Sequence, residues 1–217
     1  TNKEFAKSLA DALGLQGGFA LGEYTRTVEI ALRALQLEQG ARVLLSPLAP
    51  AVYPAVLNTL GLRPYYVDVS EGAPVLDAGP LVEAATAGGV SAVVLDAALG
   101  YLVDYEQLEG MSVPVVEDIS SGMGGYVGER AAGSLGRFVV SRLGQDAVIT
   151  AGGGGVVLCR NTRDKAALGR VVEEYPPDIL LSDMNAALGL TQVRQLEHFV
   201  ARRREVAGVL VKALQRS

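Results

Sequence analysis

The sequence predicts an α/β fold of three layers, in which a mostly parallel β-sheet is flanked by helices. From residue 42 onward, short apolar runs alternate with segments whose apolar residues recur at helical spacing. The short runs lack polar alternation, which is expected when helices cover both faces of a parallel sheet. The length of 217 residues suits one domain or two small ones, and we expect a single domain over residues 1–217 because no linker or repeat divides the sequence.

Two helices are expected before the first strand. Phe5, Leu9 and Leu13 recur at helical spacing and predict a short helix. A second helix is predicted over residues 25–35, whose apolar side chains share one face, and Gly40 ends it. The residues expected to end the first helix are a run of glycines: Gly14, Gly17 and Gly18.

Strands and helices then alternate. Helices are predicted over residues 51–60 and 81–87, between runs that are rich in β-branched and aromatic residues. The strands predicted in this part of the chain span residues 42–45, 65–69, 92–95 and 113–117.

Glycine accumulates after Glu117, and helical patterns become rare. Two later strands are predicted over residues 138–141 and 156–159, with a small excursion over residues 126–130 between them. Ser182 is expected to cap a long helix with one apolar stripe, which continues to the end of the sequence.

The composition is that of an ordinary globular protein, with 49% apolar residues, 20% charged residues and a net charge of -5. Nucleic acid is not expected as a partner, because phosphate binding needs concentrated positive charge. The one tight basic run, residues 202–204, points in different directions on a helix and is interpreted as solvated surface. Because no apolar run reaches about 18 residues, we expect no membrane span.

The single cysteine and the single histidine exclude several kinds of site. Cys159 stands alone in an apolar run, so we expect no disulfide framework and a cytoplasmic location. His198 is the only residue that could supply the base of a Ser/His/Asp or Cys/His scheme, and we interpret it as a packing or surface residue of a helix.

Asp118 follows the strand predicted over residues 113–117. Open α/β sheets place ligands at this end of their strands. From the residues alone, an acid in this position is a surface or capping group about as often as a ligand group. Gly122 and Gly124 do not predict a nucleotide loop, because no helical pattern follows them.

Four segments, in the order in which they occur, carry a family resemblance: residues 113–118, 124–128, 133–136 and 152–157. They resemble the DegT/DnrJ/StrS-type aminotransferases, which use pyridoxal phosphate to put amino groups on nucleotide-linked sugars. The resemblance extends roughly from Leu21 to Val209. It implies the large domain of a fold-type-I pyridoxal-phosphate enzyme, with the family's small C-terminal domain absent from this chain.

The resemblance also implies positions for the cofactor. Asp118 matches the carboxylate that pairs with the pyridinium nitrogen, and Thr25 matches a threonine of the helix-initial phosphate loop. Around Thr25, small residues of the family are replaced by Glu23, Tyr24 and Arg26, and Arg26 could offset the charge of Glu23. Other positions that match cofactor-binding residues are Ser121, Ser141 and Arg142.

The family's Schiff-base lysine is missing. Its position lies ten residues after the one matching Arg137 and six before the one matching Gly153, and both counts lead to Ala147. The four lysines of the chain lie elsewhere in the sequence, at Lys3, Lys7, Lys165 and Lys212. The ring-stacking aromatic position falls at Pro50 or Ala51, with Tyr53 as a possible nearby substitute.

Two functions of different classes remain open. In the first, the chain is a degenerate homologue that is inactive in transamination and serves as a binding or assembly module, as a homodimer or with an active paralogue. In the second, it binds pyridoxal phosphate noncovalently and acts on a nucleotide sugar or an amino acid. Loss of the lysine together with changes at the stacking and phosphate positions favours the first.

Overall fold

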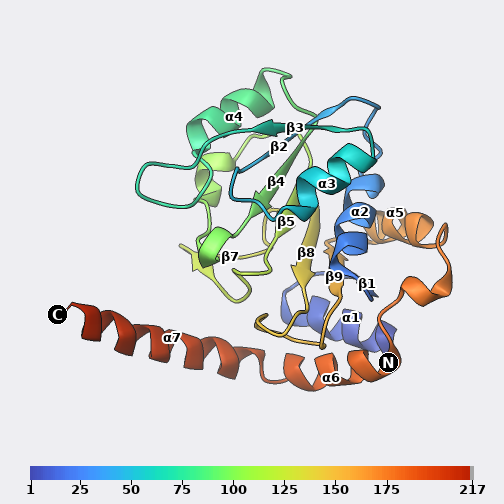
Figure 1. The fold of residues 1–217 in the computed structure, drawn as a ribbon, viewed down its shortest axis with the longest axis vertical. Helices are drawn as coiled ribbons and strands as arrows, with labels where there is room; N and C mark the ends of the chain where they lie inside the picture. The colour runs from blue at the N-terminus through green and yellow to red at the C-terminus, as the bar shows by residue number, and fades with distance from the viewer. Residues whose placement is uncertain (216–217) are drawn as a thin grey trace.

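The computed structural model describes residues 1–215 and confirms the three-layer α/β fold (Figure 1). Within these residues, the main sheet has seven strands in the order β1-β9-β8-β5-β4-β2-β3. β2 pairs in parallel with β3 and β4, β4 with β5, and β5 with β8, whereas β9 pairs antiparallel with β1 and β8. The strands are Gly17–Leu21 (β1), Arg42–Leu45 (β2), Arg63–Tyr66 (β3), Ala92–Asp96 (β4), Val115–Asp118 (β5), Phe138–Arg142 (β8) and Gly155–Cys159 (β9).

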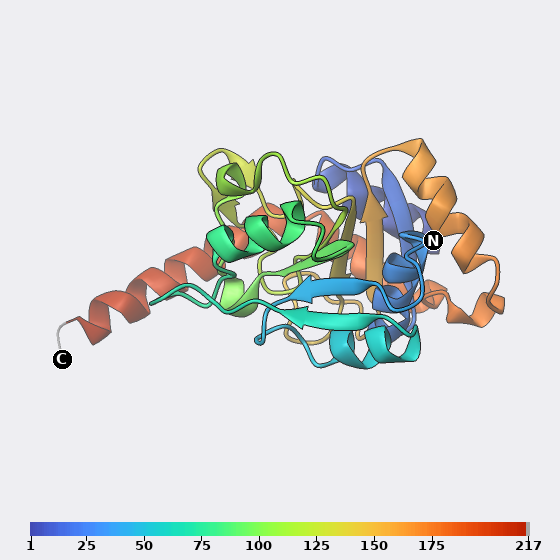
Figure 2. The same ribbon diagram turned by 90° about the horizontal axis from the view of Figure 1, so that it is seen from above.

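Helices cover both faces of this sheet. One face packs against α2 (Tyr24–Ala34), α3 (Val52–Thr59) and α5 (Thr162–Val172). On the other face, α1 (Asn2–Ala12) and α6 (Asp183–Val193) cover β1, β8 and β9, while α4 (Ala78–Thr86) covers β2 and β4. Figure 2 shows the helices on the two sides of the strands.

Burial on both faces explains the apolar runs within the central strands. Val43 and Leu45 of β2 pack into the cluster that contains α2, whereas Leu44 between them packs into the cluster that contains α4. In β9, Val157 and Leu158 divide between the two faces in the same way. Every position of such a strand loses water on folding, so an alternating pattern would place polar groups in the core.

Strand β1 was not predicted. α1 ends at Ala12 and Gly14 lies in the turn after it, as expected, whereas Gly17 and Gly18 begin this strand. β1 pairs antiparallel with β9 over its full length, Gly17 opposite Cys159 and Leu21 opposite Gly155. A methyl group on Gly18 would lie 1.9 Å from the carbonyl oxygen of Val157, so this approach requires glycine.

Two further boundaries differ from the prediction. β3 covers Arg63–Tyr66 rather than residues 65–69, because parallel pairing aligns Arg63 with Arg42 of β2. β3 is an edge strand, and its side chains are exposed. An apolar run such as residues 65–69 therefore does not show where this strand begins and ends. Helix α5 was missed altogether; Asn161 caps it by accepting from the backbone N–H of Asp164.

The long helix expected after Ser182 is two helices. Ser182 caps α6 as predicted, since its hydroxyl accepts from the backbone N–H of Asn185 at 3.2 Å. α6 ends at Val193, residues 194 and 195 form a turn, and α7 (Leu196–Leu214) follows. Figures 1 and 2 both show α7 extending away from the sheet.

The small elements complete the described chain. A two-stranded hairpin, β6 (Tyr126–Val127) with β7 (Arg130–Ala131), confirms the expected excursion. Among residues 1–215, no helix combines the length and apolar character that crossing a membrane requires. The short 3₁₀ helices are η1 (Ala98–Gly100), η2 (Tyr105–Leu108) and η3 (Pro177–Ile179).

Candidate functional site

Asp118 is the centre of a buried hydrogen-bonded cluster at the carboxyl end of β5. Its side chain is 2% exposed. One carboxylate oxygen, Oδ2, accepts from the hydroxyls of Tyr24 and Tyr53, the latter at 2.7 Å. The other, Oδ1, accepts from the backbone N–H of Ser120 at 2.9 Å. The carboxylate therefore accepts three hydrogen bonds from within the protein.

The two tyrosines reach Asp118 from different helices. Tyr24 is the first residue of α2, and Tyr53 lies in the first turn of α3 and is fully buried. Burial and the charge of Asp118 raise the pKa of Tyr24, and the same two causes raise the pKa of Tyr53. Both hydroxyls therefore stay protonated and act as hydrogen-bond donors at neutral pH.

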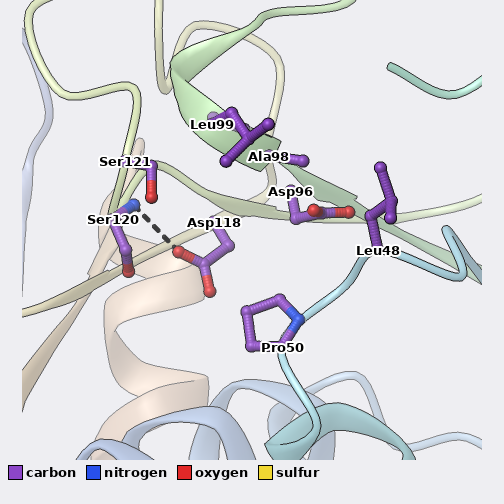
Figure 3. Close-up of a pocket in the computed structure, with 9 residues that line it drawn as sticks. Leu48, Pro50, Asp96, Ala98, Leu99, Asp118, Ser120 and Ser121 are labelled. Atoms are coloured by element: carbon purple, nitrogen blue, oxygen red, sulfur yellow. Dashed lines mark hydrogen bonds between the residues drawn. The ribbon is translucent and has the colours of Figure 1, made fainter. Parts of the chain in front are cut away.

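A cavity of about 260 Å³ adjoins Asp118. Figure 3 shows Asp96, Pro50 and Leu48 on one side of it and Ser120 and Ser121 on the other. Asp96 lies beside Asp118 in the parallel pairing of β4 and β5, and its buried Oδ1 atom has no hydrogen-bond partner among residues 1–215. Burial and then the charge of Asp118 raise the pKa of Asp96 to about 6.

Glu117, the residue before Asp118, binds a different set of hydrogen-bond donors. Its side chain is 3% exposed and accepts from the hydroxyl of Tyr105 at 2.6 Å. It also accepts from the backbone N–H groups of Gly133, Leu135 and Gly136 at 2.6 to 3.0 Å. Because the three backbone donors belong to the loop before β8, Glu117 fixes that loop to β5.

The residues that the resemblance assigns to cofactor binding are only partly brought together. Asp118 and Ser121 line the same cavity. Arg142 lies near them: its backbone N–H donates to the hydroxyl of Ser120 at 2.8 Å. Its guanidinium, however, donates to Asp146 at 2.7 Å, and this bond is the main cause that raises the pKa of Arg142.

Ser141 and Thr25 do not line the cavity. Ser141 is buried, and its hydroxyl donates to the carbonyl oxygen of Arg142 at 3.3 Å. Thr25 is exposed in the first turn of α2. Arg26, expected to offset the charge of Glu23, instead pairs with Glu29 and lies over the ring of Tyr175 at 4.8 Å.

Ala147 lies on the loop after β8 and is 8% exposed. Its carbonyl oxygen accepts from the guanidinium of Arg203 on α7 at 3.1 Å. No lysine among residues 1–215 lines the cavity beside Asp118. Lys3, Lys7 and Lys165 line a different cavity next to β1, and Lys212 lies near the end of α7.

Sequence reasoning missed three members of the cluster. Tyr24 was noted only as a replacement, Tyr53 as a possible stacking residue, and Asp96 not at all. Tyr53 is fully buried, does not line the cavity beside Asp118, and donates its hydroxyl to Asp118. Asp96 could have been found by the rule that singled out Asp118, since both acids end a parallel strand.

Cys159 and His198 fit the expected minor roles. Cys159 is buried and free, and burial raises the pKa of its thiol to about 11. A thiol with that pKa carries little thiolate at neutral pH. His198 is exposed, and its ring lies 6.1 Å from that of Phe199.

The tyrosine pKa shifts predict loss of stability in alkali. Tyr24, Tyr53 and Tyr105 are raised in pKa mainly by burial, so the folded state keeps protons that the unfolded state releases above about pH 10. The contribution of these three tyrosines to the free energy of unfolding is therefore fully present below about pH 10 and declines as the pH rises further. In a spectrophotometric titration of the eight tyrosines, these three should ionise only as the circular dichroism of the fold is lost. Reversible ionisation of all eight in the folded protein would contradict this assignment.

The mostly parallel sheet, with an acid at the carboxyl end of a central strand, has the architecture of fold-type-I pyridoxal-phosphate-dependent enzymes. A profile of the DegT/DnrJ/EryC1/StrS aminotransferase family matches residues 1–217, and the chain belongs to that family.

Solved structures share the fold at low sequence identity. A DegT DnrJ EryC1 StrS aminotransferase from Brucella abortus superposes with a TM-score of 0.87 at 20% identity, covering 98% of this chain and 63% of that one. The aminotransferase TlmJ from Streptoalloteichus hindustanus gives 0.85 at 23%, covering 99% and 63%. An E. coli GDP-4-keto-6-deoxy-D-mannose-3-dehydratase with bound hydrated PLP gives 0.86 at 18%, covering 98% and 64%. This chain thus spans less than two thirds of these structures' length.

Proposed function

We propose that this chain is a degenerate, lysine-less member of the family that serves as a binding or assembly module. The observation that carries the proposal is Ala147 at the lysine position, together with a cavity beside Asp118 whose lining includes no lysine among residues 1–215. Transamination needs an amine that forms a Schiff base and then moves a proton at the substrate carbon. A methyl side chain can do neither.

The residues of the site also do not fit pyridoxal phosphate. Asp118, the acid that would face the ring nitrogen, already accepts from two tyrosine hydroxyls. The stacking position falls at Pro50 or Ala51, neither of which is aromatic, and Thr25 is exposed outside the cavity. We therefore derive no reaction step through this cofactor.

A protein partner is the natural ligand for such a module, and we propose a homodimer or a pair with an active paralogue. Apolar side chains on α6 and α7 support this proposal, because exposed apolar surface favours protein association. Met184 is 81% exposed, and Val209 and Leu210 are 64% and 59% exposed. We further propose a cytoplasmic location, consistent with the single free cysteine.

A second candidate is supported by the cavity of about 260 Å³ beside Asp118, which is just below the range of about 300–1,000 Å³ that is usual for small-molecule pockets. In this alternative the chain binds pyridoxal phosphate noncovalently and acts on a nucleotide sugar or an amino acid. It requires that a ring reach Asp118 despite the tyrosines.

Borohydride reduction tests the proposed function. The protein is incubated with pyridoxal phosphate, reduced, and analysed by intact mass and peptide mapping. We expect no stoichiometric pyridoxyl adduct in the cleft and no turnover of an amino donor. Ala147→Lys is the matched variant: it should remain inactive, because its new amine meets a site without the stacking and phosphate contacts, and misplacement by about 1 Å can cost a hundredfold in rate.

Two results would overturn the proposal. One is a stoichiometric adduct on a wild-type lysine within reach of Asp118, and the other is transamination by the wild-type chain. The assembly part is tested separately by sedimentation equilibrium: a single monomeric species at micromolar concentration would exclude the homodimer.

A further inference from the structure

Tyr24 joins two positions that the family resemblance assigns to the cofactor, the start of α2 and Asp118. It is the first residue of α2, the helix start to which the family resemblance assigns the phosphate. Its hydroxyl donates to Asp118, the acid assigned to the ring nitrogen. We propose that the phenol of Tyr24 is a built-in occupant that takes the place of the cofactor ring. This inference rests on the proposed function and extends it, because it also excludes noncovalent cofactor binding.

The chemistry of a phenol suits this replacement. It is a flat six-membered ring that ends in one hydrogen-bond donor, as a pyridinium ring does. Oδ2 of Asp118 accepts from both Tyr24 and Tyr53, and Oδ1 accepts from Ser120. A carboxylate offers about four lone-pair sites, so three are already used within the chain.

The surroundings hold the phenol in place. Tyr53, which donates to the same carboxylate oxygen, is fully buried and cannot withdraw its hydroxyl without breaking the packing of α3. The raised pKa of Tyr24 keeps its hydroxyl protonated, so it remains a donor to the carboxylate.

The start of α2 disfavours a phosphate. Glu23 stands at the N-cap position and places a carboxylate where the helix would otherwise attract an anion. Arg26, which could neutralise it, is paired with Glu29. The free energy of phosphate binding at this helix start therefore would not offset the cost of displacing Tyr24 from Asp118.

The test compares variants of Tyr24 for binding of two probes, pyridoxamine phosphate and p-cresol. Neither probe can form a Schiff base, so binding is noncovalent. Affinity is measured by isothermal titration calorimetry and by the shift in melting temperature. The variants are Tyr24→Ala, which removes the ring, and Tyr24→Phe, which keeps the ring and removes only the donor. Tyr126→Ala is the matched control, because Tyr126 is 61% exposed on the hairpin.

We expect Tyr24→Ala to bind both probes at least about tenfold more tightly than wild type, while Tyr24→Phe and Tyr126→Ala remain like wild type. If Tyr24→Ala unfolds on its own, p-cresol should restore its melting transition. A folded Tyr24→Ala protein without gain for either probe would overturn the inference. So would a wild-type affinity for pyridoxamine phosphate equal to that of the variant, or failure of p-cresol to rescue an unfolded variant.

These outcomes are distinct from failure of the proposed function. A lysine adduct or wild-type transamination refutes the degenerate function, whatever Tyr24 does. Absence of any gain in Tyr24→Ala refutes the built-in occupant and leaves the absence of a Schiff-base lysine untouched.

Discussion

Replacing Glu117 with alanine should lower the free energy of unfolding by on the order of 4 kcal/mol. The substitution leaves three backbone N–H groups and the hydroxyl of Tyr105 without their acceptor, in a place that is 3% exposed. A buried donor without a partner costs about 1–3 kcal/mol, and water entering the gap would recover part of the total. Urea unfolding followed by circular dichroism measures the change.

Glu117→Gln refines this test. Each carboxylate oxygen accepts two hydrogen bonds, so an amide keeps one oxygen and points its NH₂ at the two donors of the other. We expect the free energy of unfolding of Glu117→Gln to lie between those of wild type and Glu117→Ala. Hydrogen exchange at the amides of Gly133, Leu135 and Gly136 should be faster than in wild type.

Glu109→Ala is the matched control. Glu109 pairs with Arg130 at 3.2 Å, but its side chain is 71% exposed, so the change should stay within about 0.5 kcal/mol of wild type. If Glu117→Ala proved as stable as Glu109→Ala, Glu117 would not anchor the loop, and a role in ligand binding would have to be considered.

Gly18→Ala should also destabilise the fold, by about 3 kcal/mol, near the upper end of the range for overpacking. The added methyl group would lie 1.9 Å from the carbonyl oxygen of Val157 and 2.7 Å from the Cα atom of Leu158. Both are backbone atoms, so no side-chain rotation can relieve the contact, and β1 must move away from β9.

Gly208→Ala controls for the general effect of replacing glycine. Nothing lies within 4 Å of a methyl group at Gly208, inside α7, so this variant should gain up to about 1 kcal/mol. Thermal unfolding of the two variants should therefore shift in opposite directions. A Gly18→Ala protein with an unchanged melting temperature would show that the β1–β9 pairing tolerates more separation than the structure indicates.

The sequence was sufficient for the elements whose signal is local. The strands near Val43, Val94 and Val140 each contain at least three consecutive apolar residues because both faces of the sheet are buried there, and a short run of residues carries that information. Ser182 could be predicted as a cap from its own residue type and neighbours. The absence of an amine at position 147 is likewise a fact of the sequence, which no packing can alter.

Tertiary structure decided the rest, because the deciding contacts join distant parts of the chain. Gly17 and Gly18 have the local character of a helix end, and only pairing with β9 makes them a strand. Tyr24 and Tyr53 lie 94 and 65 positions from Asp118, and no local pattern marks their hydroxyls as its partners. Sequence patterns report which face of an element is apolar. Which group a side chain of that element contacts is determined by tertiary packing, here the packing that brings α2, α3 and β5 together.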